Sequence, residues 1–273
     1  MRKSVVKLAI RDDDMNFFTK VEDIEEVYRE IPDFPVSFAV IPTVTDVSTV
    51  GKCPDTRGNT EPRWVGDNDK LVVWLKQKLS QGQTDVLFHG ITHGYKFIEG
   101  KRYAEMQWRK EPDLAEKIGM IKSQMETLFG YPMNVFVAPS NKISKYGIQC
   151  VSANGMNFSG LVPITFDREM TPRNLMNYTR RWFLRAKDRL PYPDVLQYSD
   201  HKELNACLLQ GYDYLVKMFH YCEKKNSPMA VNVHYWHLRD YPQERAMLMD
   251  FVKYALNHGA IPSTMSDLLK NQS

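Results

Sequence analysis

Four consecutive residues, Arg11 to Asp14, place one guanidinium and three carboxylates side by side. Adjacent carboxylates repel one another, so a fold retains them where a cation, an arginine or water compensates the charge. A solvated turn would also explain them, because aspartate favours strand ends and turns. The run directly follows an apolar stretch, Val5 to Ile10, which predicts a strand. Because sites in α/β folds form at the carboxyl ends of strands, this position favours a functional role.

Two histidines stand four residues apart in the stretch His89-Gly-Ile-Thr-His93. On a helical turn this spacing puts both imidazoles on one face, within reach of one metal ion. The flanking glycines, Gly90 and Gly94, predict a tight loop here. Together with an aspartate from another strand end, the pair predicts a site of two imidazoles and one carboxylate. Three protein ligands leave coordination positions open, as in catalytic metal sites.

Two more predicted strands end in polar residues. The run Met229 to His234 ends in a histidine, whose imidazole suits proton delivery near neutral pH. The same histidine could simply satisfy a local carbonyl group. The other strand is followed by three residues, Pro139, Ser140 and Asn141. Proline fixes the backbone there, so the next N–H groups could point into a site.

Strand and helix patterns alternate along the chain. Apolar runs predict strands at residues 5–10, 36–41, 85–88, 134–138, 158–162, 229–234 and around 261. Amphipathic periodicity predicts helices at residues 22–30, 71–79, 114–129, 204–222 and 243–258. This alternation predicts parallel β–α units in an open sheet or a barrel. Residues 43–69 and 165–200 have no clean period and are expected to be long loops or irregular insertions. No linker divides the chain, so residues 1–273 are expected to form one domain.

Composition excludes several classes of protein. The chain has 273 residues and a net charge of +3, too little charge to indicate a nucleic-acid partner. It shows neither the apolar core of a signal peptide nor a run of about 20 apolar residues that would span a membrane. The four cysteines are far apart and form no C-x-x-C pair. They are expected to be free thiols, which favours a cytoplasmic location.

The four motifs, in this order and each after a predicted strand, resemble those of the polysaccharide deacetylase superfamily, the NodB-homology or carbohydrate esterase family 4 group. The RDDD and HGITHG stretches resemble a divergent branch of it. The resemblance covers the chain from Asp12 to about His237. It implies an α/β fold, a distorted (β/α) barrel with about seven strands. It also implies one divalent metal ion and removal of an acetyl group from an N-acetylated sugar.

The resemblance also implies roles for individual residues. Asp12 would be the general base and Asp13 a metal ligand, with His234 as the general acid. The two other metal ligands would be His89 and His93. The residues implied around the oxyanion and substrate are Pro139, Ser140 with its backbone N–H, and Asn141.

Three departures from the family pattern leave alternatives open. The family arginine that braces the base is replaced by Val137, and we hypothesise that Arg11 substitutes for it. The family glycine after the aspartate pair is Asp14, so a shifted register is also open, with Asp13 as base and Asp14 as ligand. The fourth motif has no match, although residues 165–200 occupy its place. Trp236 and His237 are further candidates for the site.

The resemblance therefore implies a metal-dependent hydrolase that removes an N-acetyl group from a sugar. Zinc is the expected ion, with cobalt, nickel or manganese also possible. A cytoplasmic location favours a nucleotide- or lipid-linked precursor, as in surface-polysaccharide (O-antigen type) assembly. Two alternatives stay open: another C–N hydrolase or YdjC-type sugar deacetylase on the same barrel, and an inactive carbohydrate-binding homologue. The sequence determines neither the acetylated sugar nor the oligomeric state.

Overall fold

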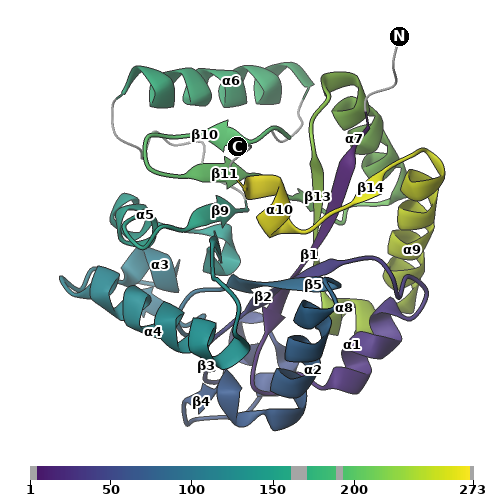
Figure 1. Cartoon of the computed structure of the whole chain (residues 1–273). Coiled ribbons are helices and arrows are strands. Elements are labelled where there is room, and N and C mark those ends of the chain that lie inside the picture. The colour runs from purple at the N-terminus through teal and green to yellow at the C-terminus, as the bar shows by residue number, and fades with distance from the viewer. Residues whose placement is uncertain (1–4, 161–170, 189–192, 271–273) are drawn as a thin grey trace.

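A central, mostly parallel sheet organises the protein, whose computed structural model describes residues 5–160, 171–188 and 193–270 (Figure 1). The strand order is β10-β11-β9-β8-β5-β2-β1-β13-β12, with β14 beside β1. Seven mutually parallel strands have three or more residues: β1 (Lys7–Met15), β2 (Val36–Val40), β5 (Thr84–Phe88), β8 (Val135–Val137), β9 (Asn157–Ser159), β11 (Lys202–Leu204) and β13 (Met229–His234). The expected α/β arrangement with about seven parallel strands is confirmed.

Shorter strands complete the sheet and form two hairpins. The short sheet strands are β10 (Leu196–Gln197), β12 (Cys207–Leu208) and β14 (Ile261–Pro262). The hairpins pair β3 (Thr43–Val44) with β4 (Arg63–Trp64), and β6 (Tyr95–Ile98) with β7 (Lys101–Ala104). The β6–β7 hairpin directly follows the two-histidine motif, so it lies at the edge of the candidate site.

Helices surround the sheet (Figure 1). They are α1 (Val21–Tyr28), α2 (Asp69–Ser80), α3 (Glu105–Trp108), α4 (Leu114–Phe129), α5 (Lys145–Ser152), α6 (Pro172–Asp188), α7 (Tyr212–Lys225), α8 (Tyr235–Asp240), α9 (Pro242–Asn257) and α10 (Met265–Leu269). Every residue of β2 and β5 is buried, as expected for parallel strands covered on both faces. Among residues 5–160, 171–188 and 193–270, no helix has both the length and the apolar character needed to cross a bilayer.

Three sequence-based expectations about these elements were wrong. The run Arg11 to Asp14 lies inside β1, not after it, because its charged side chains find partners within the protein. The helix expected at residues 204–222 begins only at Tyr212, since Gly211 has a φ of 122° that an L side chain rarely adopts. Residues 165–200 contain the 17-residue helix α6. Its apolar pairs recur on one helical face among arginines, which obscured the period.

Candidate metal centre

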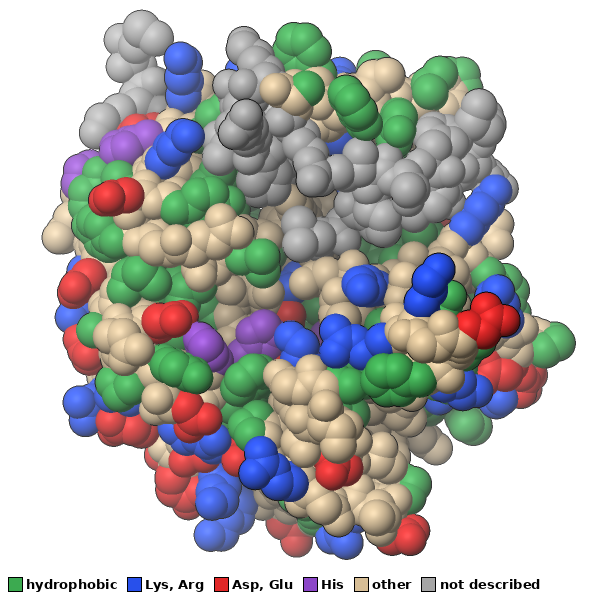
Figure 2. Space-filling model, turned by 180° about the vertical axis from the view of Figure 1, so that it is seen from behind, with side chains coloured by type: hydrophobic (Ala, Val, Ile, Leu, Met, Phe, Trp, Pro, Cys, Tyr) green, Lys and Arg blue, Asp and Glu red, His purple; other side chains and the backbone are tan. Residues whose placement is uncertain are grey.

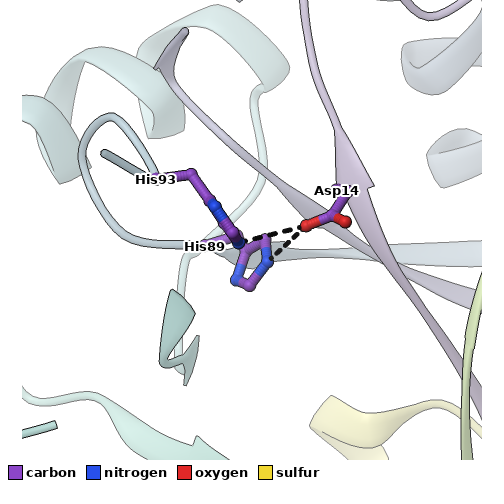
Figure 3. A group of neighbouring side chains, drawn as sticks. All are labelled: Asp14, His89 and His93. Carbon is purple, nitrogen blue, oxygen red and sulfur yellow. Dashed lines mark hydrogen bonds and ion pairs between the residues drawn. The ribbon is translucent and has the colours of Figure 1, made fainter. Parts of the chain in front are cut away.

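A bulge in β1 turns the side chain of Asp14. The pairing of β1 with β2 shifts register between Asp12 and Met15, and Asp14 has a φ of 75°, in the left-handed region. A bulge adds a residue to one strand and re-aims a side chain, so Asp14 departs from the alternation of its neighbours. Its carboxylate faces the histidines of the loop after β5 (Figure 3).

The histidine loop is shaped by a buried glutamate, not by a helical turn. His93 has a φ of 56°, and its ring meets that of His89 edge to face with centroids 4.9 Å apart. The backbone N–H groups of Ile91, Thr92 and His93 all donate to the carboxylate of Glu105. Successive N–H groups gathered around one anion form a nest, which fixes the backbone of the loop. Glu105 therefore determines how the two imidazoles are presented.

Asp14, His89 and His93 converge on one point (Figure 3). His89 Nε2 lies 3.1 Å from Asp14 Oδ1, and His93 Nε2 lies 3.2 Å from the same oxygen. Donor atoms that hold a tetrahedral zinc ion at about 2.0–2.1 Å are about 3.3 Å apart. The observed separations therefore fit a small divalent cation. Within the described part of the chain, this is the cluster of three histidine, cysteine or acidic side chains that could hold a metal.

The tautomer of His89 and the charge of Asp14 also suit a cation. The Val137 carbonyl can only accept, so its 3.0 Å hydrogen bond from His89 Nδ1–H leaves the Nε2 lone pair for an ion. Burial alone would raise the pKa of Asp14. The charge of His93, together with hydrogen bonds to both histidines, instead holds that pKa well below its usual range. An ionised carboxylate with two imidazoles is a donor set that zinc, cobalt, nickel and manganese accept.

Arg11 holds Asp13 in one orientation. Arg11 Nε donates to Asp13 Oδ1 over 2.9 Å and Nη2 donates to Oδ2 over 2.8 Å. Asn232 Nδ2 donates to Asp13 Oδ2 over 2.7 Å, and both partners of the ion pair are buried. The guanidinium also donates to Ser159 Oγ and Asn141 Oδ1. A bidentate pair fixes orientation as well as charge. The geometry thus agrees with the hypothesis that Arg11 braces a carboxylate.

Asp12 has different partners. Tyr28 Oη–H donates to Asp12 Oδ2 over 2.5 Å, and the backbone N–H of Tyr235 donates to Oδ1 over 2.8 Å. Burial raises the pKa of Asp12 to about 8, so the carboxyl group resists ionisation. The structure groups Asp14, not Asp13, with the two histidines. The shifted register agrees with this geometry, and the register with Asp12 as base and Asp13 as ligand does not.

His234 and Trp236 lie beside the cluster, whereas His237 is paired elsewhere. His234 Nε2 is 3.7 Å from Asp14 Oδ2, and burial lowers the pKa of His234. Trp236 Nε1–H donates to the same oxygen over 3.2 Å, and its ring centroid is 5.3 Å from that of His234. His237 Nε2 instead lies 3.0 Å from Glu244 Oε2. The first two residues contact the candidate centre and the third does not.

The residues after β8 reach the same centre. Pro139 is buried, and both Ser140 and Asn141 have left-handed backbones, with φ values of 55° and 52°. Ser140 Oγ lies 2.7 Å from the hydroxyl oxygen of Tyr95, which is 3.3 Å from His93 Nδ1. Backbone conformations of this kind cluster where a site requires a fixed geometry. This loop therefore forms one wall of the centre.

A cavity of about 240 Å³ opens beside His234. Its lining includes Lys52, Asn232, His234 and Trp236. The volume lies below the roughly 300–1,000 Å³ of drug-sized pockets, so only a compact part of a larger ligand fits in it. Figure 2 shows histidine side chains near the middle of one face, with lysine and arginine side chains beside them.

Three residues that support this centre were not singled out from the sequence: Glu105, Asn232 and Tyr95. Asn232 carried a usable signal, because it lies two residues before His234 and therefore on the same side of β13. No sequence signal marked Glu105 or Tyr95, since their contacts depend on how the β6–β7 hairpin folds back over the histidine loop.

No family model and no curated protein matches the chain. Solved structures do resemble it. A putative polysaccharide deacetylase from Mycobacterium smegmatis is 9% identical, with 97% of this chain and 89% of that one covered and a TM-score of 0.55. Puue allantoinase is 10% identical, with 98% and 90% covered and a TM-score of 0.58. A carbohydrate esterase family 4 pseudoenzyme from Bacillus anthracis is 9% identical, with 98% and 67% covered and a TM-score of 0.50.

At these identities the similarity concerns the fold, which matches the expectation from the sequence motifs. The chain has the (β/α) barrel fold of the polysaccharide deacetylases, the NodB-like fold.

Proposed function

We propose that the protein is a metal-dependent hydrolase that removes an N-acetyl group from a sugar or saccharide precursor. The observation that carries the proposal is the convergence of Asp14, His89 and His93 on one point, in a fold shared with a putative polysaccharide deacetylase. Asp14, His89 and His93 would hold a divalent ion, which would supply Lewis acidity to lower the pKa of a water molecule and polarise a carbonyl group. Zinc is the ion we expect, with cobalt, nickel and manganese as alternatives.

Asp13 is the proposed general base. Its carboxylate is held by Arg11 and Asn232, which keep its position fixed while it takes a proton from water. Arg11 thereby takes the place of the family arginine that is missing at Val137. Asp12, with its raised pKa and its contacts to Tyr28 and Tyr235, supports the fold of this region.

His234 is the proposed general acid. It lies across the cluster from the histidine loop and lines the cavity, so a departing amine would be within its reach. Donating a proton to that amine prevents the tetrahedral intermediate from collapsing back to the amide. The backbone N–H of Ser140 is the proposed oxyanion donor, a contribution of about 3–4 kcal/mol in comparable sites. Trp236 offers an aromatic surface beside the cavity.

The substrate we propose is a nucleotide- or lipid-linked N-acetylated sugar, as in surface-polysaccharide (O-antigen type) assembly in the cytoplasm. Four buried free cysteines support a reducing compartment. The test supplies the protein with each candidate metal ion and measures acetate release from UDP-linked and lipid-linked N-acetyl sugars. We expect release that the Asp13→Asn variant lacks. Equal release by the two proteins, or none from any acetylated sugar, would overturn the proposal.

The similarity to an allantoinase favours one alternative, hydrolysis of another C–N bond on the same barrel. The same preparation, incubated with cyclic amides and ureides, distinguishes the two reactions. Ring opening without acetate release would assign the centre to that reaction. Metal binding with neither reaction would favour the inactive homologue.

A further inference from the structure

Helix α6 exposes its apolar face, whereas the other long helices pack their apolar faces against the core. Its stripe at positions 172, 175, 176, 179, 182, 183 and 186 shares one helical face, and every residue in it is exposed. Four of these are large apolar side chains: Leu175 is 47% exposed, Met176 46%, Trp182 55% and Phe183 69%. We call these four residues the α6 apolar stripe. An exposed apolar stripe of this kind marks an interaction surface.

Polar residues lie on the side of α6 that faces the protein. Asn174 and Asn177 are buried, and Asn177 Nδ2 donates to the backbone carbonyl of Gln197 in β10. Arg181 Nη1 donates to the hydroxyl of Tyr198. The helix is thus attached to the sheet by hydrogen bonds while the α6 apolar stripe is exposed. Figures 1 and 2 agree, with α6 on the upper rim of the molecule and hydrophobic side chains along that rim.

The charge of α6 identifies what would cover this stripe. The helix carries five basic residues and one acidic residue, Asp188 at its last position. Two of the basic residues, Arg173 and Arg180, are exposed next to the stripe. Apolar and aromatic side chains flanked by cations are the pattern of helices that lie in the interface of an anionic bilayer. A second copy of this cationic helix would be repelled.

We propose that α6 is a membrane-docking helix that inserts its apolar stripe into the surface of an anionic phospholipid bilayer. The tryptophan would lie at the level of the lipid headgroups, which is the preferred depth of its ring. Arg173 and Arg180 would contact the lipid phosphates. This membrane contact is independent of the proposed deacetylation.

Vesicle co-sedimentation tests the proposal on the full chain. We expect the protein to sediment with vesicles of equal parts phosphatidylglycerol and phosphatidylcholine, and at least tenfold less with phosphatidylcholine alone. Trp182→Ser combined with Phe183→Ser should weaken binding at least tenfold, because the apolar contact is removed. A matched pair on the exposed surfaces of other helices, Val73→Ser with Met120→Ser, should bind as the wild type does.

Reversing the charge of the exposed arginines on α6 tests the electrostatic part of the proposed membrane contact in the same vesicle assay. Arg173→Glu with Arg180→Glu should weaken binding to anionic vesicles at least tenfold, whereas Lys70→Glu with Lys76→Glu on α2 should change it less than threefold. Wild-type protein that fails to sediment with anionic vesicles, or stripe variants that bind unchanged, would overturn the proposal. So would a wild-type dimer in light scattering that the Trp182→Ser, Phe183→Ser variant converts to a monomer, since the stripe would then be a subunit contact.

Discussion

At the scale of single residues, the three adjacent aspartates have three different environments. Asp14 faces two imidazoles, Asp13 is held by a guanidinium, and Asp12 is bonded to a tyrosine hydroxyl and a backbone N–H. The pKa values of Asp12 and Asp14 are shifted in opposite directions, because burial dominates for the first and histidine contacts for the second. Neighbours in sequence therefore have separate roles, which isosteric substitutions can distinguish.

Asparagine substitutions at Asp13 and Asp14 should have different effects. Asp14→Asn removes the anionic ligand, so we expect it to lose bound metal as well as activity. Asp13→Asn keeps all three ligands, so we expect wild-type metal content with turnover reduced about 10²–10⁴-fold, the range for loss of a general base. Elemental analysis of both purified variants measures the metal. Metal loss in Asp13→Asn with retention in Asp14→Asn would contradict the assignment.

Arg11→Lys tests whether the two hydrogen bonds from Arg11 to Asp13 matter in addition to the positive charge of Arg11. Lysine keeps the positive charge but cannot form the bidentate contact with Asp13. We expect kcat to fall at least tenfold with KM changed less than threefold and metal content unchanged. Steady-state kinetics and elemental analysis check this. A rise in KM alone would instead place Arg11 in substrate binding.

At the scale of elements, the histidine loop depends on α3. Glu105, at the start of α3, accepts hydrogen bonds from three consecutive backbone N–H groups of the loop and from Arg109. We expect Glu105→Gln to weaken metal affinity about 10–100-fold, as outer-shell substitutions do. Titration against a competing chelator measures this affinity. Glu111→Gln is the matched control, since Glu111 also pairs with Arg109 but makes no described contact with the loop. Equal affinities in both variants would refute the role of Glu105.

Gly90 packs tightly between the histidine loop and the turn after β8, with no room for a side chain. It has a φ of 67°, and a Cβ there would lie 2.4 Å from Pro139 Cγ and 2.6 Å from Glu105 Oε2. Gly100 has a similar φ of 74° with nothing within 4 Å of an added Cβ. We expect Gly100→Ala to cost about 1–2 kcal/mol of unfolding free energy from the backbone conformation alone. Gly90→Ala should cost more, as urea unfolding can measure. Equal costs would mean that the loop moves aside freely.

At the scale of the whole molecule, the metal would join distant parts of one core. Its ligands come from β1 and from the loop after β5, two strands separated in the sheet by β2. We propose that the chain is a single domain that unfolds in one transition. A metal present at 100 times its dissociation constant stabilises the folded state by about 2.7 kcal/mol. Removing it with a chelator should lower Tm by roughly 5–10 °C. Calorimetry showing no shift would mean that no ion is bound.

Much of the architecture could be predicted from local pattern. The boundaries of β13 and α4 agree with those expected from apolar runs and helical periodicity, because both elements bury their apolar residues in the ordinary way. Helix α6 was missed because arginines separate its apolar pairs, and periodicity does not tell whether an apolar face is buried or exposed.

The sequence by itself determined which chemical groups are available and that His89, His234 and Pro139 end or follow strands, because hydrophobic period is a local property of the chain. It placed the run Arg11 to Asp14 after the first strand, whereas the run lies inside β1. The extent of β1 puts Arg11 and Asp13 on one side of that strand through simple alternation, which the structure alone shows. Only the tertiary structure decided that Asp14 joins the histidines. A bulge and a left-handed φ at that residue break the alternation, and they depend on the pairing of β1 with β2, which no local pattern encodes.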